Sequence, residues 1–256
     1  MKDLTNPAKR ILNLVHQIKA MPDQQPMGEA WGEVLGLDQE VARLDSHEVY
    51  EKLRFVRNEL DLLQKLMRGT TFSSDLYEPY LQRVRNTIAV NNLASPWGNF
   101  KSNLHDDTIL ALKYCSDILP SEPDIDPTEL ENILSSIHEI KLEIENSSLS
   151  KGMYEFLLGQ LAIIENAIQN YPIAGGSAIK KAFTEGLADW AAHADDISSA
   201  TNEDTEKSSK VYGVWGSLKV AGEEFVKADR MANSLMGLVN KGQAVSDSVI
   251  GWLTSP

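Results

Sequence analysis

Several features that mark large classes of protein are missing from this sequence of 256 residues. It has one cysteine, Cys115, so no disulfide can form within the chain, and its helical spacing from Ala111 and Ile118 predicts a packed thiol rather than a reactive one. The longest uncharged run, 86–100, spans 15 residues, fewer than the roughly 18 to 20 apolar residues of a membrane helix. The first 21 residues lack the apolar core of a secretory signal. We therefore expect a soluble cytoplasmic protein without a membrane span.

Diagnostic enzyme motifs are missing as well. The sequence contains no phosphate-binding GxxxxGK[ST] or GxGxxG loop, no HExxH or CxxC motif and no GxSxG nucleophile turn. These absences argue against several large enzyme classes, but an enzyme whose catalytic residues are scattered along the chain stays open. We expect no cofactor.

Positive charge is scarce in the second half of the chain. Residues 1–120 carry 14 Lys and Arg against 16 Asp and Glu, a net charge of −2, whereas residues 121–256 carry 10 against 21, a net charge of −11. An acidic surface repels the phosphates of nucleic acids and of anionic lipids, so nucleic acid is not expected as a ligand. A basic partner protein fits the charge better.

What the sequence does contain is helical periodicity in every long segment, without alternating strand patterns. Helix starts are marked by Asn6-Pro7 and by Asp126-Pro127, where a polar cap precedes a proline in the first turn. A heptad stripe typical of coiled coils follows steps of four and three. It consists of Val49, Leu53, Val56, Leu60, Leu63 and Met67. We predict an all-α fold, a multi-helix bundle of two subdomains with a long C-terminal amphipathic helix.

An acidic, proline-rich connector at 120–127 predicts the main boundary. The segment before it, 1–120, is expected to form an N-terminal helical subdomain, and 121–197 a helical hairpin. Residues 198–210 are Ser, Thr, Asn and charged residues with almost nothing apolar, which predicts a flexible linker. Residues 211–256 would then form a separate C-terminal amphipathic module.

This C-terminal module is the strongest candidate for a binding surface. Its apolar residues recur in steps of three and four from Val211 to Val239, a rod of roughly 45 Å at ~1.5 Å per residue. Glycines such as Gly213 and Gly216 interrupt the stripe, so that a partner backbone could approach closely. The residues expected to contact a partner are Val211, Val214, Leu218, Phe225, Leu235, Val239 and Trp252. Docking on the rest of the chain, pairing with a second copy and lying on a membrane surface are open alternatives.

The adjacent pair His105-Asp106 is the first of two candidate metal-binding groups. In this pair the sequence resembles the HD phosphohydrolases, all-α enzymes in which such a pair shares a metal. The resemblance implies an upstream histidine, for which His47 or His16 would serve, and a downstream aspartate, for which Asp189 is one candidate. The structural alternative is that the aspartate lies in the first turn of a helix, where a carboxylate favours the positive end of the helix dipole.

Asp189, His193 and Asp196 form the second candidate metal-binding group. Their i, i+4, i+7 spacing places all three on one helix face, where carboxylate and imidazole ligands could hold a divalent ion. They flank the apolar stripe through Trp190 and Ala194 rather than lying in it. A solvated polar helix face is therefore the simpler explanation.

Two classes of function remain, with a third behind them. The leading hypothesis is a non-enzymatic helical protein that binds another protein or assembles into an oligomer, and a bacterial accessory or regulatory role in immunity or defence fits the composition. The stretch 140–176 resembles helical pairs in bacterial proteins of unassigned function. The alternative is a metal-dependent phosphohydrolase built on His105 and Asp106. The third hypothesis is a membrane-surface effector acting through residues 211–253.

Overall fold

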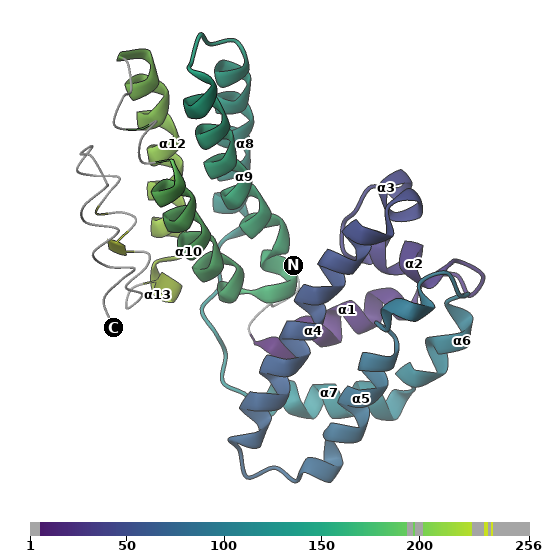
Figure 1. Cartoon of the computed structure of the whole chain (residues 1–256). Helices are drawn as coiled ribbons and strands as arrows, with labels where there is room; N and C mark the ends of the chain where they lie inside the picture. The colour runs from purple at the N-terminus through teal and green to yellow at the C-terminus, as the bar shows by residue number, and fades with distance from the viewer. Residues whose placement is uncertain (1–5, 194–196, 198–201, 227–232, 235–236, 238–256) are drawn as a thin grey trace. The chain divides into compact units, whose positions relative to one another are not determined.

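The predicted all-α fold is confirmed by a computed structural model (Figure 1), whose described residues form helices and no β-strand. The structure describes residues 6–193, 197, 202–226, 233–234 and 237. The chain divides into two compact units. Unit 1 comprises Met1–Asp124 and Pro172–Gly175, and unit 2 comprises Ile125–Tyr171 and Gly176–Pro256. The division after Asp124 falls inside the proline-rich connector.

Unit 1 is built around its first helix, which packs against both α4 and α7. Its helices are α1 (Pro7–Lys19), α2 (Met27–Val34), α3 (Gln39–Leu44), α4 (Ser46–Arg68), α5 (Glu78–Asn86), α6 (Gly98–Lys101) and α7 (Asp106–Ile118), with the 3-10 turns η1 (Ser74–Leu76), η2 (Val90–Asn92) and η3 (Ser102–Leu104). The cap predicted for α1 is present, because the Asn6 side chain accepts a hydrogen bond from the Lys9 backbone N–H at 2.9 Å. The whole heptad stripe of α4 is buried within this unit.

A charged cluster is buried inside unit 1. Arg10 on α1 is 1% exposed, and its guanidinium donates to Glu59 on α4 and, at 2.6 Å, to Glu122 in the connector. Burial raises the pKa of Glu59 to about 7, although Arg10 acts in the opposite direction. Gly175 packs against the same guanidinium with a φ of 54°, and a Cβ there would overlap Arg10. The cluster thus joins four separate segments of unit 1.

Unit 2 is an up-down-up-down four-helix bundle. Its helices are α8 (Pro127–Glu145), α9 (Lys151–Ala174, to Tyr171 in this unit), α10 (Gly176–Ala192) and α12 (Asn202–Ala221), followed by the single turn α13 (Glu223–Val226). Lys207 near the start of α12 bonds Glu143 near the end of α8, whereas Gly222 after α12 lies near Ile125 before α8, so these two helices are antiparallel. Figure 1 shows all four long helices side by side.

A buried polar residue links three helices of this bundle. Gln160 on α9 is fully buried; its amide oxygen accepts from the Trp215 indole N–H at 2.8 Å. Its amide nitrogen donates to the backbone oxygen of Gly186 at 3.2 Å and to the carboxylate of Asp189 at 2.8 Å, both on α10. Because all of these groups are satisfied, the network fixes how α9, α10 and α12 pack.

The linker expected at 198–210 is helical where the structure describes it, and residues 198–201 lie outside the described residues. Residues 202–210 form the first half of α12, which packs against α8 and belongs to the same compact unit as residues 125–171. Ion pairs with a distant part of the chain accompany this helix, because Lys207 and Lys210 both bond Glu143. The amino-acid composition of the segment alone cannot predict such contacts. The expected rod is also interrupted, since Gly222 forms a turn between α12 and α13.

Candidate functional site

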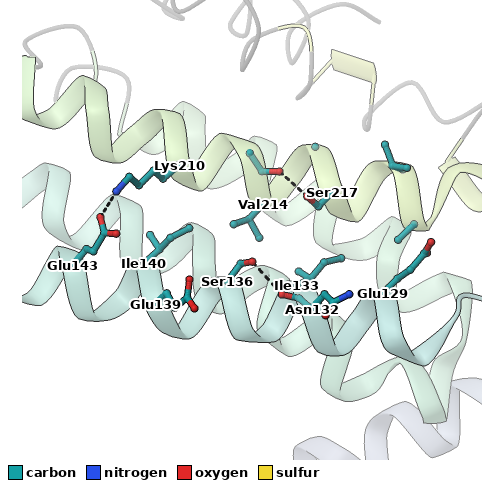
Figure 2. Close-up of a pocket in the computed structure, with 14 residues that line it drawn as sticks. Glu129, Asn132, Ile133, Ser136, Glu139, Ile140, Glu143, Lys210, Val214 and Ser217 are labelled. Carbon is teal, nitrogen blue, oxygen red and sulfur yellow. Dashed lines mark hydrogen bonds and ion pairs between the residues drawn. The ribbon is translucent and has the colours of Figure 1, made fainter.

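An elongated groove of about 900 Å³ runs along unit 2 between α8 and α12 (Figure 2). Lining residues recur every three or four positions, so one face of each helix forms one wall. They are Glu129, Asn132, Ile133, Ser136, Glu139, Ile140 and Glu143 on α8, and Lys210, Gly213, Val214, Gly216, Ser217, Val220 and Ala221 at α12. From Glu129 to Glu143, α8 rises roughly 21 Å at ~1.5 Å per residue. That length matches about four turns of a further helix.

The floor of the groove is apolar and its α12 wall is low. Ile133, Ile140 and Val214 are buried at its base, whereas Val220 is 73% exposed at its edge. A Cβ added to Gly213, or to Gly216 one turn further along, would meet no atom within 4 Å. The groove is therefore open in part because these two positions of α12 lack side chains.

Neither of these glycines is required by the fold of the described chain. Both lie inside α12, where glycine costs about 1 kcal/mol relative to alanine, and neither has a positive φ. Gly176 is different, because a Cβ there would overlap the Phe225 ring. Gly222 also lies close to a neighbour, with its added Cβ 3.0 Å from Ile179. The space over Gly213 and Gly216 therefore serves no packing contact among the described residues of unit 2.

Charge is distributed unevenly along the groove. Glu143 closes one end, where its carboxylate accepts from Lys207 at 2.9 Å and from Lys210. These hydrogen bonds, from Lys210 first and then from Lys207, lower the pKa of Glu143 to about 2. The other two carboxylates of the α8 wall, Glu129 and Glu139, are exposed and form no ion pair with any residue that the structure describes. The α12 wall contributes no acid, so the uncompensated negative charge is on the α8 side.

The residues predicted to bind a partner lie mostly elsewhere. Val211, Val214 and Leu218 are at most 5% exposed, because they pack in the bundle core, and only Val214 contributes to the groove floor. Phe225 is half-buried and packs on Tyr171 with ring centroids 6.3 Å apart. The remaining predicted contacts are outside the described residues: Leu235, Val239 and Trp252. For the described apolar stripe, docking on the body of unit 2 is thus what the structure shows.

The sequence makes the α12 wall of the groove a candidate binding surface, but it does not identify the α8 wall. Gly213 and Gly216 were recognised as points of close approach, but the polar stripe of α8 through Ser136 and Glu139 looks like any solvated helix face. Its significance depends on α12 lying alongside, which is a tertiary property. The available signal was the pair of glycines in an otherwise helical stretch.

The predicted His105-Asp106 metal site is not assembled in the structure. His105 is exposed at the N-terminal cap position of α7, and Asp106 projects into solvent with 99% of its side chain exposed, paired with Lys19 at 3.1 Å. His16 and His47 are exposed on α1 and α4. Within the described part of the chain, no three His, Cys, Asp or Glu residues form a group that could hold a metal ion. Asp106 instead lies in the first turn of α7, as the structural alternative predicts.

Asp189 and His193 are close together on α10, but both are engaged in structural contacts. The Asp189 carboxylate accepts from Gln160, and the His193 Nδ1 atom lies 3.0 Å from the Asp189 backbone oxygen and 3.4 Å from its carboxylate. The His193 ring packs on Phe156 at 5.4 Å between centroids. Asp196, the third predicted ligand, is outside the described residues. The two described members therefore support the bundle core.

Comparison with known proteins adds no further candidate site. No family model, no curated protein and no solved structure matched the chain. Among the described helices, none is long and apolar enough to cross a membrane. The groove between α8 and α12 is therefore the candidate site of unit 2.

Proposed function

We propose that this protein is a helical interaction module and that unit 2 binds a partner protein in the groove between α8 and α12. The observation that carries the proposal is the open space over Gly213 and Gly216, two mid-helix glycines that destabilise α12 without serving any contact in the described chain. A partner that approaches this wall closely gives the two glycines a use.

The composition of the groove supports a protein ligand. An apolar floor between polar edges is the arrangement by which grooves bind amphipathic helices, with the apolar face of the ligand inserted and its polar face in water. Ile133, Ile140 and Val214 supply the floor, and Asn132 and Ser136 on the rim offer hydrogen-bonding groups. The opening is long and continuous, which favours an extended helical surface over a small compact molecule.

Site-specific photo-crosslinking in the native cell tests this proposal, with the crosslinking amino acid at Ser136 and, as a control, at Ser135. Both serines are exposed, and each hydroxyl donates to the carbonyl four residues earlier, but only Ser136 lines the groove. We expect a discrete protein adduct from position 136 that is absent from position 135. Gly213→Leu should abolish it, since Gly213 lines the groove and a Cβ at this position meets no described atom within 4 Å, so that the larger side chain extends into the groove.

Equal adducts from the two positions, no adduct at all, or an adduct that persists in Gly213→Leu would each contradict a binding role for the groove. Circular dichroism of the Gly213→Leu protein serves as the folding control. We expect its helix content to be unchanged, because leucine has a higher helix propensity than glycine.

A further inference from the structure

We infer that the ligand of this groove is a basic amphipathic helix of another protein, with two Lys or Arg residues about three turns apart facing Glu129 and Glu139. The inference rests on the proposed function and adds the chemistry of the partner. Its first support is the asymmetry of the two walls. The α8 wall bears two carboxylates without an ion-pair partner among the described residues, whereas the α12 wall carries only small or apolar residues beyond Lys210, which pairs with Glu143. A matching helix has cations on one flank and small or apolar residues on the other.

The spacing of the carboxylates sets the spacing of the cations. Glu129 and Glu139 are ten residues apart on α8, which is roughly 15 Å along the axis and close to three full turns. Both therefore lie on the same wall of the groove, as the lining pattern requires. A helix lying along α8 would place basic residues ten or eleven positions apart opposite them, since eleven residues also complete about three turns.

The ion pairs of Glu143, at one end of the groove, indicate where cations of the ligand would bind most favourably. Lys207 and Lys210 already neutralise Glu143, so a further cation gains little at that end. Glu129 and Glu139 have no such partner among the described residues. The attraction for a basic helix is thus concentrated over the part of the groove that runs from the start of α8 to its second half.

The same charges argue against a second copy of this chain as the occupant. The whole chain carries a net charge of −13, and residues 121–256 carry −11 of it, so two copies repel one another at this face. A basic partner is attracted by the same field, and long-range attraction of this kind accelerates association and is reduced by salt.

A display library of random 16-residue sequences in a helix-stabilised scaffold, selected against the full-length protein, tests the inference. We expect the enriched peptides to carry a net positive charge, with Lys or Arg at a spacing of ten or eleven beside an apolar stripe. The variant Glu129→Gln/Glu139→Gln should weaken their binding at least tenfold at low salt. The control variant Glu131→Gln/Glu145→Gln removes the same charge from exposed positions of α8 outside the groove and should bind like the unmodified protein.

Enrichment of neutral or acidic peptides, equal weakening by the two double variants, or a selection in which no helix enriches would overturn the inference. So would a full-length homodimer that Gly213→Leu converts to a monomer in light scattering, because the occupant would then be a second copy. These failures are distinct from failure of the proposed function, since the adduct at Ser136 in the cell reports on occupancy whatever the charge of the ligand.

Discussion

Units 1 and 2 each contain a cluster of three charges, and the two clusters are opposites. In unit 1 a single cation, Arg10, lies between the carboxylates of Glu59 and Glu122, and the central side chain is 1% exposed. In unit 2 a single anion, Glu143, lies between two lysines at the end of the groove and is 39% exposed. The first cluster is part of a core, whereas the second is part of a surface.

The glycines of the two units differ in the same way. Gly175 in unit 1 has a left-handed backbone and packs directly on the Arg10 guanidinium, so folding explains why glycine is there. Gly213 in unit 2 has ordinary helical geometry and open space where a side chain would be. Unit 1 therefore uses its unusual glycine internally, whereas unit 2 contains a glycine that no contact among the described residues requires.

The largest effect is expected from removing the central cation of unit 1. Arg10→Met would leave Glu59 buried without its partner, which typically costs about 3 to 5 kcal/mol of unfolding free energy. Hydrogen exchange of the full-length protein in increasing urea measures this loss separately in α1 and α4 and in the helices of unit 2. We expect faster exchange in unit 1 and little change in unit 2.

Two control variants show whether burial is the cause. Arg54→Met removes an arginine from an exposed i, i+3 pair with Glu51, and we expect no measurable change in exchange. Without Arg10 the pKa of the buried Glu59 carboxyl rises further, because Arg10 is the group that lowers it. Adding Glu59→Gln to Arg10→Met replaces this unpartnered carboxyl by a neutral amide and should recover part of the lost stability. Equal losses in Arg10→Met and Arg54→Met would remove the contrast between the two clusters.

A smaller effect of opposite sign is expected in unit 2. Gly213→Ala should stabilise α12 by about 0.5 to 1 kcal/mol, because alanine is the better helix former and its methyl group meets no atom within 4 Å. The slowest-exchanging amides of α12 provide the measurement. The same change should weaken photo-crosslinking at Ser136, because a methyl group at position 213 occupies part of the space that a closely approaching partner uses.

Gly175→Ala is the matched substitution in unit 1. It forces alanine into a left-handed conformation and against Arg10, so we expect a loss of about 1 to 3 kcal/mol. If both alanine variants destabilised the protein, Gly213 would have a structural role of its own. No external ligand would then be needed to explain that glycine.

Local signals in the sequence predicted much of the fold. Pro7 and Pro127 mark the starts of α1 and α8 as expected, and the heptad stripe of α4 is buried throughout. These features depend on residues a few positions apart, which is the range over which capping and helical periodicity act. The proline-rich connector likewise contains the division between the units.

Features that depend on distant residues were not predicted. The sequence predicts a linker at 198–210, yet its described part, 202–210, is helical, and Lys207 and Lys210 bond Glu143, more than sixty positions earlier in the chain. The groove itself exists only where α12 lies along α8. The resemblance carried by His105 and Asp106 also suggested a metal pair. In the structure both side chains are exposed, and no group of three possible metal ligands forms among the described residues.

The smallest expected effect is on the pH dependence of the unfolding free energy, which differs between the two charged clusters. Glu143 has a folded-state pKa of about 2, below the ordinary glutamate value of 4.5, so its contribution to stability is complete above about pH 4.5 and is lost as the pH falls towards 2. Glu59 has a raised pKa of about 7, so the folded protein holds this proton more tightly than the unfolded chain does. Its effect on the free energy of unfolding is therefore the reverse of that of Glu143, and it lowers this free energy as the pH rises from about 4.5 to 7. Urea unfolding between pH 2 and 7 measures both.

Glu143→Gln should flatten the acid side of that stability profile, and Glu59→Gln the side between pH 4.5 and 7. In a protein that already carries Lys207→Met and Lys210→Met, Glu143→Gln should make no further difference, because the hydrogen bonds that lower the pKa of Glu143 are gone. An acid slope that survives Glu143→Gln unchanged would mean that solvent screens the lysine contacts at the end of the groove. Glu143 would then be as available to a basic ligand as Glu129 and Glu139, and the preferred cation spacing in that ligand would extend along the whole of α8.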